Sequence, residues 1–291
     1  MEKGNWKAWL LAARPKTLTA SVSPVLVGSA LAYHDGSFRW VPAVLCFFVA
    51  LWAQVAANLA NDYFDFRKGA DTGERLGPSR AVASGWIAPG AMWRAALGVL
   101  ALACLCGCGL LFYGGWQLIW VGLAVAVCAI AYSAGPYPLA YNGWGDVCVL
   151  LFYGIVPVCF TYYTQTNAFS PTAFWLSMSM GLLSVNILLV NNCRDCAQDR
   201  AAGKRTTVVL FGRRFGHVLY LTNILLAVAF SWPVYLFRGW NCRLLFLFFL
   251  ILQLFTWQDL LRLQGRELNR TLEQTARNVL LYALLLISML I

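Results

Sequence analysis

The chain has 291 residues, of which 60% are hydrophobic and only 12% are charged. Apolar runs of 18 or more residues recur along its length, which excludes an ordinary soluble domain and indicates a polytopic helical membrane protein. Topology and an anionic ligand account for the net charge of +10, so no nucleic-acid partner is expected. The start of the chain lacks the pattern of a cleaved signal peptide, so none is expected.

Taken in chain order, the hydropathy pattern predicts about nine transmembrane helices in one all-α domain over residues 1–291. The predicted spans are 18–34, 41–61, 91–113, 117–134, 146–165, 172–192, 216–236, 244–263 and 273–291. The links at 62–90 and 193–215 are long and hold nearly all of the polar residues. The link at 135–145 is a Pro/Gly turn rich in aromatic residues.

Basic residues lie almost entirely on one side of this predicted arrangement. When the N-terminus and the even-numbered links share a face, that face receives 19 of the 22 Lys and Arg residues. Only Arg39, Arg238 and Arg243 fall on the other face. The positive-inside rule therefore predicts a cytoplasmic N-terminus, an external C-terminus and cytoplasmic positions for both polar links.

Two acidic clusters end apolar runs, one in each half of the chain. Their carboxylates are Asp62, Asp65 and Asp71 in the segment 58–71, and Asp195 and Asp199 in the segment 191–204. Carboxylates are costly at membrane depth and usually mark an ion or substrate site. Asn61 precedes Asp65 by four residues and Asn191 precedes Asp195 by four, so each pair shares a helix face. The pattern favours a divalent-cation site with oxygen ligands, such as Mg²⁺; solvated helix ends are the alternative.

The ten cysteines favour no metal or disulfide site. Cys193 and Cys196 form a CxxC pair, but a zinc site needs two further ligands nearby. The two histidines, His34 and His217, are too few and too scattered to supply them. The cysteines are therefore interpreted as small side chains of apolar helices.

The two acidic motifs resemble those of the UbiA superfamily of intramembrane aromatic prenyltransferases. The first family motif, NxxxDxxxxxD in this branch, matches Asn61, Asp65 and Asp71, and the second, DxxxD, matches Asp195 and Asp199. The flanking residues are most similar to the branch that prenylates 1,4-dihydroxy-2-naphthoate in menaquinone synthesis. These flanking matches are Arg14–Leu18 with Pro24 and Gly28, Lys68–Asp71, Asn191–Asp195, Gly203–Lys204 and Thr206–Gly212. The resemblance covers nearly the whole chain.

The chain departs from the family pattern at two places. Arg205 stands where many members have Asn, and the 135–145 link lacks a basic residue often found there. These departures concern the contacts to the aromatic acceptor more than the diphosphate site.

The resemblance implies a Mg²⁺-dependent transferase of the bacterial cytoplasmic (inner) membrane, built as a helical bundle with a central cavity. It would move a polyprenyl group from polyprenyl diphosphate to 1,4-dihydroxy-2-naphthoate, releasing diphosphate and CO₂ and giving demethylmenaquinol. The implied catalytic and metal-binding residues are Asp65, Asp71, Asp195 and Asp199, with Asp62 as an auxiliary ligand. The implied substrate-binding residues are Asn61, Lys68, Arg75, Arg80, Tyr137, Tyr141, Asn191, Arg194 and Lys204. Tyr63, Phe64, Tyr137 and Tyr141 could stabilise an allylic cation or anchor the protein at the interface.

Three alternatives remain open at the level of sequence. One is another UbiA-type acceptor such as 4-hydroxybenzoate. The second is a cation-coupled transporter, although its carboxylates would be expected nearer mid-membrane. The third concerns the pair Arg14 and Lys16, which either contacts the carboxylate of the substrate or anchors the first span at the membrane edge.

Overall fold

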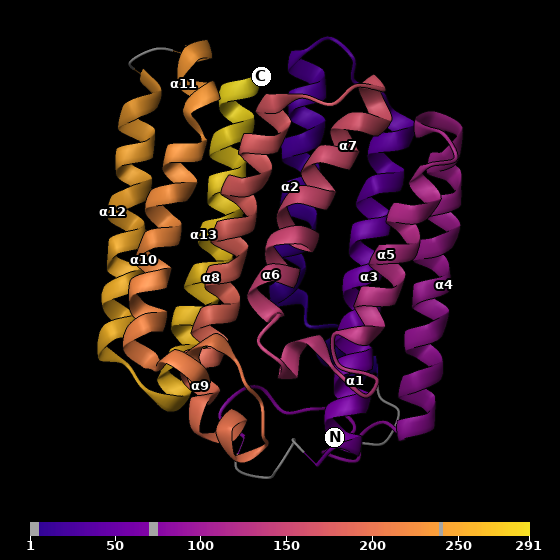
Figure 1. Cartoon of the computed structure of the whole chain (residues 1–291), viewed down its shortest axis with the longest axis vertical. Coiled ribbons are helices and arrows are strands. Elements are labelled where there is room, and N and C mark those ends of the chain that lie inside the picture. The colour runs from indigo at the N-terminus through magenta and orange to yellow at the C-terminus, as the bar shows by residue number, and fades with distance from the viewer. Residues whose placement is uncertain (1–5, 70–74, 239–240) are drawn as a thin grey trace.

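The computed structural model describes residues 6–69, 75–238 and 241–291, so Asp71 lies outside the described residues. Within these ranges the regular structure is entirely helical. Figure 1 shows the long helices running alongside one another as a bundle, with α1 (Trp6–Ala13) and α9 (Thr207–Phe211) at one end and the C-terminus at the other. The all-α membrane fold predicted from the hydropathy pattern is confirmed.

The first half of the chain surrounds what proves to be the site. Its helices are α1 (Trp6–Ala13), α2 (Pro15–His34), α3 (Trp40–Arg67), α4 (Pro89–Gly114), α5 (Leu118–Ala131) and η1 (Leu139–Tyr141). A composite span follows, made of α6 (Gly145–Leu150), the π-helical turn η2 (Leu151–Ile155) and α7 (Val156–Thr166). Proline stands in the first turn of α2 and α4, where its missing N–H costs nothing.

The second half packs mainly around α8 (Pro171–Ala201). The remaining elements are α9 (Thr207–Phe211), α10 (Arg213–Phe230), α11 (Trp232–Arg238), α12 (Asn241–Arg262), η3 (Gly265–Glu267) and α13 (Leu268–Leu290). The hydroxyl of Ser170 caps α8 by accepting from the backbone N–H of Ala173 at 3.4 Å. Buried residues of α8 share one core cluster with α2, α7, α10, α12 and α13, so α8 lies between the two halves.

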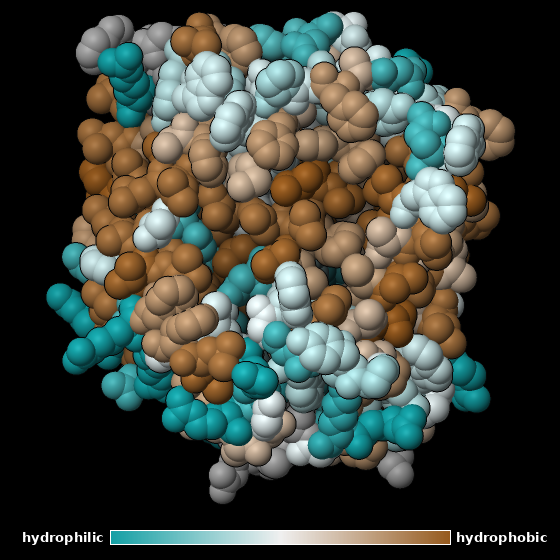
Figure 2. Space-filling view, viewed as in Figure 1, coloured by the Kyte–Doolittle hydropathy of each residue, from teal (hydrophilic) through white to brown (hydrophobic). Residues whose placement is uncertain are grey.

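Six helical segments in the described part of the chain are long and apolar enough to cross a membrane. Each of the nine predicted spans coincides with one helix or with consecutive helices. That all nine cross the membrane stays a prediction. α5 is apolar but short, with 14 residues. Figure 2 shows a broad hydrophobic band across the middle of the visible face, with hydrophilic residues at both ends and more of them at the end that carries α1 and α9.

The acidic-motif carboxylates that the structure describes, Asp62, Asp65, Asp195 and Asp199, lie on helices rather than in links. α3 continues six residues beyond the predicted end at 61, and α8 continues nine residues beyond the predicted end at 192. Glycine and proline are absent from both extensions. The helices stop where Gly69 and Gly203 adopt φ values of +66° and +72°, which favour glycine. The side chains of these four residues are therefore fixed on rigid helices.

Candidate active site

A cavity of about 620 Å³ lies among α2, α3, α4, α5, the α6–α7 span and α8. Much of its wall is apolar and includes Val25, Leu110, Leu118 and Phe160. One end is polar, where the C-terminal turns of α3 and α8 bring Asp65, Asp195 and Asp199 to the same wall. The cavity therefore joins an apolar chamber to a cluster of charged groups from both halves of the chain.

Asp65 is buried and held by two donors. The hydroxyl of Tyr141 donates to Oδ1 at 2.9 Å, and Nη2 of Arg80 donates to Oδ2 at 3.0 Å. Asp65 is 5% exposed and Arg80 is 8% exposed, so water screens this ion pair weakly. Arg80 comes from the segment before α4, and this contact fixes that segment against α3.

Arg194 joins the two halves at the polar end. Its Nε and Nη2 donate to the two oxygens of Asp195 at 2.8 and 2.6 Å, and its Nη1 donates to Oδ1 of Asn269 at 2.7 Å. Asn269 in turn donates to the carbonyl of Leu76 at 2.9 Å. The guanidinium also lies against Gly77, where an added Cβ would approach Nη2 to 2.7 Å. A side chain at position 77 would displace this arginine.

Two lysines approach the ring of Tyr141. Nζ of Lys68 is 4.4 Å from the ring centroid and Nζ of Lys204 is 4.8 Å from it. Lys68 also donates to the carbonyl of Ser133 at 2.6 Å, and Lys204 lies 3.5 Å from Oδ1 of Asp199. These lysines bring positive charge to the 135–145 link, which lacks a basic residue of its own. Tyr141 thus orders the charged groups of the site.

The pKa of the Lys68 ammonium is lowered from its ordinary value, chiefly by partial burial. The carboxylate of Asp65 opposes this shift, and the nearby charge of Lys204 adds to it. A phosphate group placed between the two ammonium groups would relieve their mutual repulsion.

Other expected site residues also reach the cavity. Asn61 lines it and accepts a hydrogen bond from the hydroxyl of Ser133. Asn191 and Arg75 line it too, and Nε of Arg75 donates to the carbonyl of Pro78 at 3.0 Å. Arg14 lines the cavity from the start of α2, with a left-handed φ of 53°. Lys16, in contrast, pairs with Glu273 at 2.5 Å on the exposed surface.

Four expected site residues lie elsewhere. Asp62 is 1% exposed, and its two oxygens accept from the backbone N–H groups of Ala81 at 3.0 Å and Val82 at 3.3 Å. It is not among the described residues that line the cavity, and neither is Tyr137, which is 59% exposed. Tyr63 and Phe64 pack against Trp93, with ring centroids 5.4 and 5.2 Å away. Their geometry favours structural roles over the predicted contacts.

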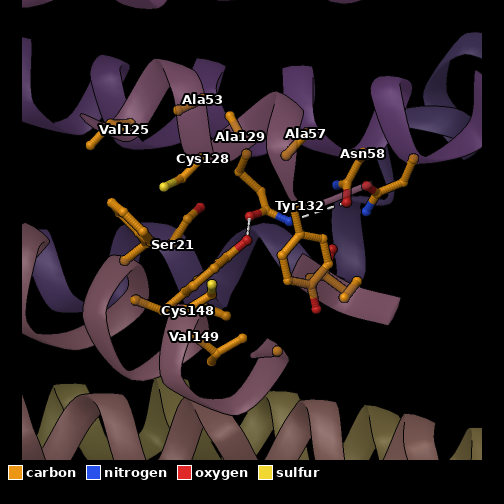
Figure 3. A pocket seen from close by; sticks show the side chains of 18 of the residues that line it. Ser21, Ala53, Ala57, Asn58, Val125, Cys128, Ala129, Tyr132, Cys148 and Val149 are labelled. Carbon is orange, nitrogen blue, oxygen red and sulfur yellow. Dashed lines mark hydrogen bonds between the residues drawn. The ribbon is translucent and has the colours of Figure 1, made fainter. Parts of the chain in front are cut away.

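Several polar residues on the cavity wall were missed by sequence reasoning. Figure 3 shows Tyr132 in the cavity, with Asn58 on one side and Cys128 and Cys148 on the other. Asn58 accepts from Gln54 at 3.2 Å, and Gln54 accepts from the hydroxyl of Tyr153. These uncharged residues lie within apolar spans, so the sequence gives little indication that they line a site. Asp146 also lines the cavity, and its charge at the start of a predicted span was the available clue.

The charged groups are not preassembled as a metal cluster. Among the described residues, no three His, Cys, Asp or Glu side chains stand close enough to hold an ion together. Asp65, Asp195 and Asp199 nevertheless all line the same cavity, so the three carboxylates face a common region. Carboxylate oxygens supplemented by phosphate oxygens and water are the donor set that Mg²⁺ prefers. The residues present fit Mg²⁺ bound together with a diphosphate.

The comparisons with known proteins agree with this architecture. A model of the UbiA prenyltransferase family matches residues 21–286. The 1,4-dihydroxy-2-naphthoate octaprenyltransferase of Escherichia coli (strain K12) is 36% identical over 248 residues, which cover 80% of each chain. The corresponding enzyme of Haemophilus influenzae is 37% identical over 250 residues, covering 79% of this chain and 81% of that one.

Solved structures show the same fold at low identity. A UbiA homologue from Archaeoglobus fulgidus bound to GPP and Mg²⁺ aligns with a TM-score of 0.67 at 16% identity, covering 97% of this chain and 99% of that one. A homologue from Aeropyrum pernix aligns with a TM-score of 0.70 at 15% identity, covering 95% and 97%. With a family model that spans most of the chain, two relatives above 30% identity and a shared fold, the chain belongs to the UbiA prenyltransferase family.

Proposed function

We propose that the protein transfers a polyprenyl group from polyprenyl diphosphate to 1,4-dihydroxy-2-naphthoate. Diphosphate and CO₂ leave, and demethylmenaquinol is the product. The observation that carries the transfer chemistry is the meeting of an apolar cavity with carboxylates and basic groups from both halves of the chain. The choice of acceptor is supported by relatives of that name with 36% and 37% identity over about four-fifths of the chain.

The polar end of the cavity would hold the diphosphate. Asp65, Asp195 and Asp199, with Asp71 outside the described residues, would hold Mg²⁺. When bound there, Mg²⁺ supplies Lewis-acid stabilisation of the charge that develops on the leaving diphosphate. The residues proposed to contact phosphate oxygens are Lys68, Arg75, Arg80, Arg194 and Lys204. Guanidinium groups suit this task because they donate in a planar fork.

The apolar part of the cavity would hold the isoprenoid chain, because burying its methylene groups is favourable at about 0.8 kcal/mol each. The acceptor ring would then lie beside the first carbon of the donor, near Tyr132 and Asn58. Arg14 also lines the cavity and follows Ala13, whose carbonyl accepts from Asn58 at 2.9 Å. We propose that Arg14 contacts the acceptor carboxylate. The ring carbon that bears this carboxylate attacks the allylic carbon, and loss of CO₂ restores aromaticity.

Carboxyl-labelled acceptors test this proposal. With purified protein, polyprenyl diphosphate and Mg²⁺, label from dihydroxynaphthoate should leave as CO₂ in step with prenyl transfer, and a chelator should stop the transfer. 4-Hydroxybenzoate is the matched comparison, since it is prenylated beside its hydroxyl and keeps its carboxylate. Prenylation of the benzoate with retained label, and no reaction of the naphthoate, would overturn the assignment of the acceptor.

A further inference from the structure

Asp146 is a carboxylate on the cavity wall that the family motifs leave unexplained. It stands in the first turn of α6, next to the Tyr132 side of the cavity. Oδ2 accepts a hydrogen bond from the hydroxyl of Thr207, at the start of α9. Oδ1 is buried and has no hydrogen-bond partner among the described residues. The segment after α8 therefore fixes one oxygen and leaves the other uncommitted.

The surroundings of Asp146 differ from those of the motif carboxylates. Asp65, Asp195 and Asp199 each have an arginine or lysine within 3.5 Å. For Asp146 the stabilising contact in the described part of the chain is the neutral hydroxyl of Thr207. Charge is costly in such a setting, so an isolated carboxylate there is suited to exchanging protons rather than holding a cation.

Tyr132 connects Asp146 with the polar end of the cavity. Tyr132, Asp146 and Asp65 all line the same cavity. The hydroxyl of Tyr132 also lies beside the start of α6, because a Cβ added to Gly145 would stand 3.4 Å from it. Figure 3 shows the Tyr132 ring in the cavity between α3, α5 and α6. An aromatic acceptor placed against Tyr132 would bring its hydroxyl toward Asp146.

We infer that Asp146 takes the proton from the acceptor hydroxyl during prenyl transfer and returns it afterwards. This inference rests on the proposed function. As the carboxylated ring carbon bonds to the allylic carbon, the allylic C–O bond breaks and its electron pair leaves with diphosphate. The neighbouring ring hydroxyl becomes a carbonyl, and its proton passes to Asp146.

The second half of the cycle restores the carboxylate. The intermediate carries a carboxylate beside a ketone, so the C–CO₂ bond breaks and its electron pair moves to the ketone oxygen. That oxygen then takes the proton back from Asp146, giving the quinol with no net proton change. Both transfers occur at one oxygen of the acceptor, so a single carboxylate held by Thr207 suffices. Tyr132 is a positioning residue in this scheme, because it orients the ring.

Asp146→Asn, Asp146→Glu and the matched control Asp35→Asn test the inference. Asp35 accepts from Tyr162 at 2.6 Å, outside the described cavity wall. We expect Asp146→Asn to lower kcat by about 100-fold or more, with unchanged KM for the donor and unchanged binding of a non-reactive thiolodiphosphate in the presence of Mg²⁺. Asp146→Glu should recover part of kcat, and the control should match the wild type.

The dependence of the activity loss on the acidity of the acceptor hydroxyl gives a second measurement. A purely structural role of Asp146 would not produce such a dependence. A ring-fluorinated acceptor has a more acidic hydroxyl, so it should lose less activity in Asp146→Asn than the parent acceptor does. Unchanged kcat in Asp146→Asn, or equal losses with both acceptors, would overturn the inference while the wild-type transfer still stands. A wild type that prenylates no naphthoate would instead overturn the proposed function, and the inference with it.

Thr207→Val is a second variant that tests the same inference if Asp146→Asn does not accumulate in the membrane. This variant preserves the carboxylate but removes the hydroxyl that orients it. We expect kcat to fall several-fold at unchanged donor KM, because a misdirected base transfers protons less efficiently. Wild-type kcat in Thr207→Val would contradict the proposed role of the carboxylate.

Discussion

Asp62 and Asp65 stand three residues apart on α3, yet their surroundings give them different tasks. Asp65 faces the cavity and meets Arg80 and Tyr141. Asp62 turns away and accepts from two consecutive backbone N–H groups, those of Ala81 and Val82. It thereby fixes the segment that delivers Arg80 to the site.

This difference predicts separable effects of the same substitution. Asp65→Asn should remove most prenyl transfer, because it removes charge at the diphosphate end. It should also lower stability, because the buried Arg80 guanidinium loses its carboxylate partner. Asp62→Asn should destabilise the fold by about 1–3 kcal/mol, because at least one buried backbone N–H loses its acceptor. Binding of Mg²⁺ with a thiolodiphosphate separates the two variants, since Asp62→Asn should retain this binding and Asp65→Asn should lose it. Retained binding in Asp65→Asn, or lost binding in a folded Asp62→Asn, would contradict this division of roles.

The sequence was sufficient to predict that most of the charged residues lie close together, because the spacing of the motifs places them at corresponding ends of two helices. It was insufficient to separate Asp62 from Asp65. Their distinction depends on residues 80–82 and 141, and contacts so distant along the chain leave no local pattern. The same limit hid Asn269, which holds Arg194 from 75 residues away.

At the scale of elements, glycine allows the cavity wall to pack closely on α8. A Cβ added to Gly154, in the π-helical turn η2, would stand 2.5 Å from both the Cα of Gly181 and the carbonyl oxygen of Ser177. These are backbone atoms, so little can move aside. The close approach sets the position of α6, and hence of Asp146, relative to the motif on α8.

Gly154→Ala should therefore destabilise the protein by about 1–3 kcal/mol through overpacking. It should also lower activity, because α6 and α8 would be forced apart. Gly98→Ala in α4 is the matched control, since an added Cβ there meets nothing within 4 Å. Thermal unfolding in detergent measures both variants. Equal midpoints for the two substitutions would contradict the importance of this contact.

Helix positions followed from hydropathy far better than helix ends did. The predicted spans 41–61 and 172–192 stop where polarity begins, but α3 and α8 continue to Arg67 and Ala201. Hydropathy indicates whether a side chain prefers lipid or water. The backbone, in contrast, continues as a helix until a residue such as Gly69 ends it. More weight on the absence of Gly and Pro after each apolar run would have extended both predicted helices.

At the scale of the whole molecule, α1 and the C-terminal end of α13 lie at opposite ends of the bundle (Figure 1). Together with the 19 basic residues assigned to one face, this predicts a cytoplasmic α1 and active site and an external C-terminus. Reporter fusions at both termini measure this orientation. Both reporters on the same side of the membrane would refute the arrangement and its nine crossings.

The ion pairs at the polar end of the cavity have a consequence for how ligands arrive. Asp65, Asp195 and Asp199 each form an ion pair with a basic side chain. A metal ion that binds alone must therefore break these ion pairs and leave buried positive charges without a counter-ion. Diphosphate that binds alone would take the basic side chains and leave the carboxylates without a counter-ion. Only the two together satisfy every group, so each should tighten the binding of the other by an equal factor, about 5- to 150-fold for a typical coupling. Heterotropic cooperativity of this kind keeps the protein from collecting divalent ions when no donor is present.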